Sequence, residues 1–94
     1  MEMRQLVNRM EEADLIESQY ELSQFWFGRG KSYVSSMKCR GRKPSTEALL
    51  YLSRQIEMMA KAFSKSDILG IRNRVGPMRK IIDAINDEID TRLL

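Results

Sequence analysis

The sequence predicts an all-α fold, a small bundle of five to six helices, from two observations. Apolar residues recur at intervals of three and four along most of the chain, which is the spacing of one helix face. No stretch alternates apolar and polar residues in the manner of a strand. At 94 residues the length fits one domain by the usual prior of roughly 100–200 residues. The core should be thin, because a chain this small buries only about 60–65% of its unfolded surface.

The first helix is expected from Met1 to Ile16, because apolar residues there recur at helical spacing. A second helix is expected to begin at Ser18, since Ser18-Gln19-Tyr20-Glu21 has the S-x-x-E form of a capping box. In such a box the Ser18 hydroxyl accepts from the N–H of Glu21, and the Glu21 carboxylate accepts from the N–H of Ser18. Gly28 and Gly30 should end this helix, because glycine tolerates the positive φ of a sharp turn.

Four more elements complete the bundle. The third helix is expected over Lys31–Cys39, with Val34 and Met37 toward the core. Ser45 resembles the N-cap of a fourth helix that ends near Ser64, with this buried stripe: Leu49, Leu52, Ile56, Met59, Ala60 and Phe63. A short helix over 67–75 follows. The last helix should start with Pro77 at its first position and run to about Leu93.

Charge is distributed unevenly along the chain. The net charge is only +3, yet no acid occurs between Glu21 and Glu47. Six cations lie in that interval: Arg29, Lys31, Lys38, Arg40, Arg42 and Lys43. A charge run of this kind is usually a solvated face. Here it coincides with a pair of short helices joined by a glycine turn, which favours contact with a polyanion, and DNA first among them.

Composition argues against other classes. The chain has no His, the commonest general base and metal ligand. Its single Cys39 cannot form an internal disulfide and fits a reducing compartment. No run approaches the roughly 20 apolar residues of a membrane span. We therefore expect a cytoplasmic protein that is not an enzyme, needs no metal or cofactor and does not enter the membrane.

Residues 18–52 resemble the helix-turn-helix of the Cro and phage-repressor (XRE-like) family. The matching residues are Glu21-Leu22-Ser23, Gly28, Ser32-Tyr33-Val34-Ser35, Arg42-Lys43-Pro44-Ser45 and Glu47-Ala48-Leu49. Two differences stand out: one additional residue lies between Leu22 and Val34, and Arg29 replaces the apolar residue that usually follows the turn glycine. At the family's acidic position near the end of the third helix this sequence has Lys38.

The resemblance implies how the third helix would meet DNA, with its N-terminal part foremost in the major groove. Carried over to this sequence, the residues facing base edges are Lys31, Ser32, Tyr33, Ser35 and Ser36. The residues facing phosphates are Gln19, Arg29, Lys38, Arg40, Arg42 and Lys43. Residues 1–66 would then be a helix-turn-helix DNA-binding domain.

The last helix carries Met78, Ile82, Ile85 and Ile89 at intervals of four, three and four, a heptad-like spacing. This stripe could close the chain's own core or meet a second copy. We predict the second role, so that residues 67–94 dimerise the protein and a homodimer binds a palindromic operator. The resulting prediction is a sequence-specific, repressor-like transcriptional regulator that binds double-stranded DNA. The alternative, motivated by the aromatic residues and methionines, is a helical module that binds a second protein, such as an antiactivator or an antitoxin-like partner.

Overall fold

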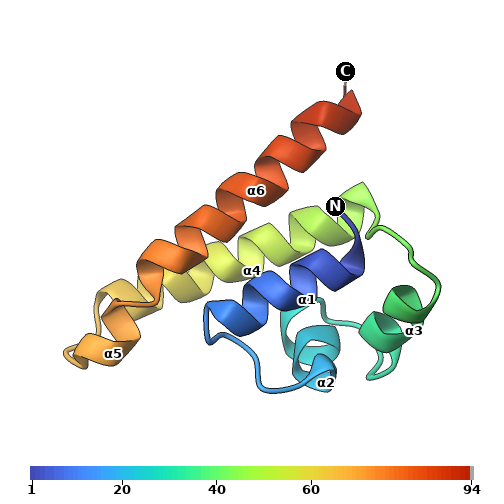
Figure 1. Ribbon diagram of the computed structural model, residues 1–94. Coiled ribbons are helices and arrows are strands. Elements are labelled where there is room, and N and C mark those ends of the chain that lie inside the picture. Colours follow the sequence, from blue (N-terminus) through green and yellow to red (C-terminus); the bar gives the residue numbers. More distant parts are fainter. Residues whose placement is uncertain (94) are drawn as a thin grey trace.

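A computed structural model describes residues 1–93 (Figure 1), and those residues form helices and no strand, which confirms the predicted all-α class. The elements in order are α1 (Met3–Glu12), α2 (Gln19–Glu21), the π-helical turn η1 (Leu22–Trp26), α3 (Tyr33–Cys39), α4 (Thr46–Ser64), α5 (Leu69–Arg72) and α6 (Val75–Leu93). The two long helices α4 and α6 run antiparallel and pack along one another. The shorter helices α1, α2 and α3 lie along the N-terminal half of α4 (Figure 1), and α1 also borders α6, with which it lines a pocket.

One apolar cluster holds these helices together. It includes Leu6 of α1, Leu22 of η1, Val34 of α3, Leu49 of α4 and Ile85 of α6, all without exposed surface. The same cluster thus includes residues from both sides of position 66. The predicted helix-turn-helix segment and the C-terminal helices therefore share a single core.

The predicted helix starts are largely those of the structure. The Ser45 hydroxyl accepts from the N–H of Ala48 at 3.1 Å, and α4 has the predicted end at Ser64. The Ser18 hydroxyl accepts from the N–H of Glu21 at 3.2 Å. The other half of that capping box was predicted wrongly, since the Glu21 carboxylate accepts from the N–H of Glu17 at 3.1 Å.

Helix ends differ from the predictions where tertiary contacts decide them. The first helix stops at Glu12 instead of Ile16, because Asp14 adopts a left-handed φ of 57° that no helix continues through. This turn places Leu15 in the core, 6% exposed. The last helix begins at Val75, two residues before Pro77. Proline is tolerated there because N–H groups in a first helical turn need no carbonyl partner.

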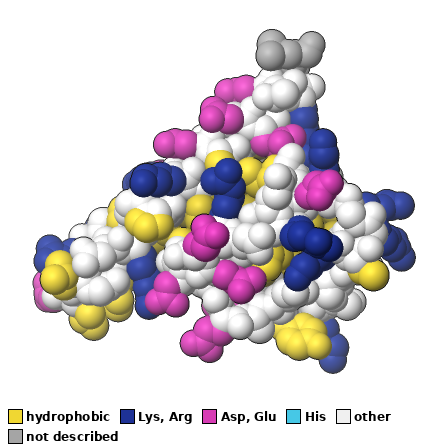
Figure 2. Space-filling view, in the orientation of Figure 1, with side chains coloured by type: hydrophobic (Ala, Val, Ile, Leu, Met, Phe, Trp, Pro, Cys, Tyr) yellow, Lys and Arg dark blue, Asp and Glu magenta, His cyan; other side chains and the backbone are white. Residues whose placement is uncertain are grey.

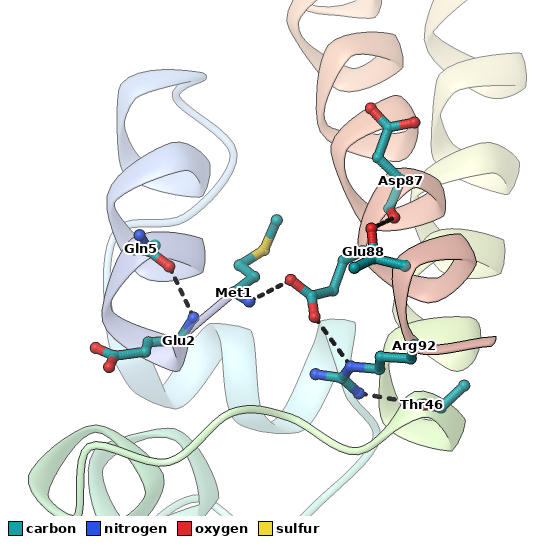
Figure 3. A network of polar contacts seen from close by, with 8 residues as sticks. Met1, Glu2, Gln5, Thr46, Asp87, Glu88 and Arg92 are labelled. Carbon is teal, nitrogen blue, oxygen red and sulfur yellow. Dashed lines mark hydrogen bonds and ion pairs between the residues drawn. The ribbon is translucent and has the colours of Figure 1, made fainter. Parts of the chain in front are cut away.

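A polar network joins the start of α1 to the ends of the two long helices (Figure 3). The amino group of Met1 donates to Glu88. Arg92 donates from Nε to Glu88 at 3.0 Å and from Nη1 to Thr46 Oγ1 at 3.2 Å. The hydrogen bond from Met1 lowers the pKa of Glu88, partial burial opposes it, and the bond from Arg92 adds to the lowering.

Candidate nucleic-acid interface

The helix that precedes the glycine turn ends in a π turn. The N–H of Phe27 donates to the carbonyl of Leu22 at 3.0 Å, an i to i+5 bond. A π turn holds one residue more than an α turn. The segment that joins Leu22 to Val34 therefore begins with a turn wider than that of an α-helix.

Ser23 connects this turn to α3. Its side chain is fully buried, donates to the carbonyl of Gln19 at 2.9 Å and accepts from the N–H of Val34 at 3.0 Å. The second bond links residues 11 apart and sets where α3 starts relative to α2. The sequence pointed to Ser23 only as part of the Glu21-Leu22-Ser23 match to the helix-turn-helix family, which predicted no role for its hydroxyl.

Gly28 is required at the turn for two reasons. Its φ is +63°, in the region that favours glycine. A Cβ at this position would lie 2.6 Å from the Tyr51 hydroxyl oxygen, because Tyr51 of α4 lies over the turn. The turn is therefore held closely against α4.

The outer face of α3 is uncovered. The helix starts at Tyr33 rather than at Lys31, so Lys31 and Ser32 lie in the turn before it. Val34 is the fully buried residue of α3, whereas Ser35 and Ser36 are exposed. The C-terminal helix α6 packs along α4 and leaves α3 open (Figure 1). Four of the five residues predicted to face base edges are thus exposed: Lys31, Ser32, Ser35 and Ser36.

Tyr33 differs from those four. Its ring is half-buried and meets the Phe27 ring edge to face, with 5.2 Å between the centroids. The Arg29 guanidinium lies 5.1 Å from the centroid of the same ring. Burial raises the pKa of Tyr33, and the charge of Arg29 opposes that rise. Tyr33 therefore packs on Phe27 and lies beside Arg29, and part of its ring stays accessible.

The predicted phosphate-facing residues lie around this face. Four of them are exposed, namely Arg29, Arg40, Arg42 and Lys43, and Lys38 and Gln19 are half-buried. None of the five cations forms an ion pair with a carboxylate in the described part of the chain. Figure 2 shows Lys and Arg side chains along the edge that carries the loop after α3, and Asp and Glu side chains over α6.

The loop that carries the last three of these cations is held in place by its backbone. The N–H of Met3 donates to the carbonyl of Arg42 at 3.1 Å, and the N–H of Arg42 donates to the carbonyl of Met37 at 3.0 Å. Buried Pro44 follows. The cationic side chains therefore project from an ordered loop.

Comparison with known protein families identifies the family of this chain but gives no activity for it. A family model described as a family of unknown function, DUF6626, matches residues 3–93. The chain belongs to this family. No curated protein and no solved structure matches the chain. The geometry described above is therefore what supports a function for this DUF6626 member.

The predicted dimerisation stripe lies inside this DUF6626 chain. Met78 and Ile85 have no exposed surface, and Ile82 and Ile89 are 7% and 8% exposed. They belong to the common core, in which α6 packs on α4. The assignment of these residues to a dimer interface is corrected: their burial completes the chain's own core, the alternative that the spacing left open.

Two kinds of site are absent from residues 1–93. No helix there has both the length and the apolar character of a membrane span. No group of three or more acidic, Cys or His side chains there has the arrangement of a metal site. Cys39, at the end of α3, is a free and exposed thiol.

Proposed function

We propose that this protein is a DNA-binding transcriptional regulator whose helix α3 enters the major groove. The observation that carries the proposal is an exposed surface of cations with no acid between residues 21 and 47. The surface is built on a helix pair fixed by the buried Ser23 hydroxyl. Long-range attraction to phosphates follows from the charge, and a rigid frame for base contacts follows from the packing.

In this proposal the protein makes two kinds of contact with DNA, one to phosphates and one to base edges. Arg29, Lys38, Arg40, Arg42, Lys43 and Gln19 face the phosphates and set the register. Lys31, Ser32, Ser35 and Ser36 project toward base edges, where hydroxyl and ammonium groups can bond acceptors such as guanine O6 and N7. With the five cations on phosphates, log K falls with log salt at a slope of roughly −4.5.

Two copies on a palindromic operator double the number of bases read, and we retain this arrangement in the proposal. The pairing surface lies outside the stripe on α6, since that stripe is buried. Sedimentation of the protein with and without an operator duplex gives the stoichiometry. As the mode of regulation we propose repression by occupancy of the operator, in the cytoplasm.

A fluorescence-anisotropy titration with labelled duplexes tests the proposal. The first duplex is the sequence upstream of the protein's own gene, and the reference is a shuffled version of it. Replacing Arg40, Arg42 and Lys43 together with Gln should weaken binding and lower the magnitude of the salt slope by about 3.

A variant with the same change of net charge serves as the control. Replacing Lys61, Lys65 and Arg72 with Gln removes three cations from the C-terminal end of α4 and from α5, far along the chain from α3. Specific binding should persist in that control. Equal loss in both variants, or equal affinity for the shuffled duplex at physiological salt, would contradict the proposal.

A second candidate is a module that binds another protein. It is favoured by large apolar side chains in solvent near α5, where Ile68 and Leu69 are 61% and 63% exposed. Exposed apolar clusters often mark protein interfaces. Co-purification of a stoichiometric protein partner, lost in Ile68→Ser with Leu69→Ser, together with absence of DNA binding at low salt, would favour this candidate.

A further inference from the structure

A groove beside η1 has a chemistry that the DNA-binding proposal does not use. It has a volume of about 380 Å³ and is lined mainly by apolar and aromatic side chains. Its walls are Leu15, Phe25, Trp26, Met59, Phe63, Glu21 and Arg74. In Figure 1, the loop that supplies Leu15 lies on the side of α2 that faces α5. The groove therefore lies on a different part of the surface from the outer face of α3.

Three aromatic rings line the groove, those of Phe25, Trp26 and Phe63. Phe25 is 45% exposed, and its ring meets that of Trp26 edge to face with 5.0 Å between centroids. Phe63, from α4, is half-buried and packs against the core. Such rings attract apolar groups by burial and cations by the negative charge of their faces.

One end of the groove is acidic. A polar pocket lined by Asp14, Glu17, Glu21 and Arg74 adjoins it, and Leu15, Glu21 and Arg74 line both. Arg74 Nη2 donates to Asp14 Oδ2 at 2.9 Å, so these two charges offset one another. Glu17 and Glu21 remain, and neither forms an ion pair with a cation of the described residues. The adjoining pocket therefore has three acids against one base, a charge of −2. The charged residues of the groove itself are Glu21 and Arg74.

We infer that this groove binds a small hydrophobic cation, an organic ammonium compound that carries an aromatic or bulky apolar group. The apolar part would lie between Phe25, Phe63 and Met59, and the cationic part would lie at the end that carries Glu21. With Arg74 paired to Asp14, an anionic ligand would meet the Glu21 carboxylate, and a neutral one would leave that carboxylate uncompensated. Charge complementarity and the aromatic walls therefore favour a hydrophobic cation as the ligand.

The protein offers its own probe, because Trp26 is the single tryptophan of the chain. The experiment is a fluorescence titration, with excitation of Trp26, against benzyltrimethylammonium. The matched ligand is neopentylbenzene, in which carbon replaces the charged nitrogen at nearly equal size. We expect a saturable change with one site for the cation, and affinity for the neutral molecule lower by about tenfold.

Two variants test the two parts of the groove. Glu21→Gln keeps an oxygen that can accept from the N–H of Glu17, so folding should be retained while affinity for the cation falls about fivefold and affinity for the neutral molecule stays unchanged. Phe63→Leu retains apolar volume and removes the ring, so binding of the cation should weaken. Glu47→Gln, an exposed acid in the first turn of α4 outside the groove, is the control and should bind the cation like the parent protein.

Three results would overturn the inference. They are the absence of a saturable change in Trp26 fluorescence, equal affinity for the cation and the neutral molecule, and equal loss in Glu21→Gln and Glu47→Gln. The titration contains no DNA. Its failure would therefore leave the DNA-binding proposal standing, and its success would not depend on that proposal.

Discussion

The buried hydroxyl of Ser23 gives the sharpest test of how the helix pair is built. In Ser23→Ala the N–H of Val34 loses its acceptor, at a residue with no exposed surface. Leaving a buried donor unsatisfied costs about 1–3 kcal/mol. Loss of the bond to the carbonyl of Gln19 adds little, because that bond is only partly buried and water can replace it. The free energy of unfolding should fall by about 2 kcal/mol.

For a domain of this size a loss of 2 kcal/mol corresponds to a fall in Tm of about 8–16 °C. Urea unfolding followed by circular dichroism gives the free energy directly. Ser53→Ala is the matched control: its hydroxyl donates only to the Leu50 carbonyl within the same helix. That control should change stability by less than about 0.5 kcal/mol.

A second measurement separates the loss of the hydrogen bond between Ser23 and Val34 from general destabilisation. Exchange of the Val34 amide with deuterium should accelerate in Ser23→Ala by more than the change in global stability accounts for, because the helix pair can separate locally. If Ser23→Ala and Ser53→Ala unfold at the same urea concentration, the hydroxyl does not hold α3, and the reasoning fails.

Three further predictions concern the turn, the core and pH. Gly28→Ala should lower the free energy of unfolding by more than Gly41→Ala in urea titrations, because both have φ near +60° but only the Cβ at Gly28 meets Tyr51; equal losses would show that this contact is unimportant. Ile85→Ala should cost about 2–5 kcal/mol through an internal cavity, with a midpoint independent of protein concentration, whereas a concentration-dependent midpoint would restore the dimer role of the α6 stripe. The pKa of Glu88 is lowered from 4.5 in the folded chain, so its contribution to stability is present above pH 4.5 and is lost as pH falls through the lower folded pKa. The pH dependence of the unfolding midpoint below 4.5 should accordingly be shallower in Glu88→Gln, and an unchanged slope would count against the Met1–Glu88–Arg92 network.

Local chemistry allowed the sequence to predict much of this protein. Ser45 caps α4 as predicted, because a hydroxyl before a run of helix-forming residues needs only the backbone N–H three positions ahead, that of Ala48. The all-α class followed from apolar spacing in the same way. The basic interval from Arg29 to Lys43 needed no structure either, since it depends only on the order of the residues.

Other features depend on contacts between distant residues, and only the tertiary structure decided them. The sequence around Ile85 is the same whether this residue packs on α4 or on a second copy of the chain. Its burial, with α6 packed on α4, places it in the chain's own core. The hydrogen bond between Ser23 and Val34 joins residues 11 positions apart, so no local pattern predicts it. The aromatic groove likewise exists because the loop after α1 brings Leu15 close to Phe63 of α4. Capping and charge order are local properties of the chain, whereas the partner of an apolar face is set by the free energy of the whole packed core.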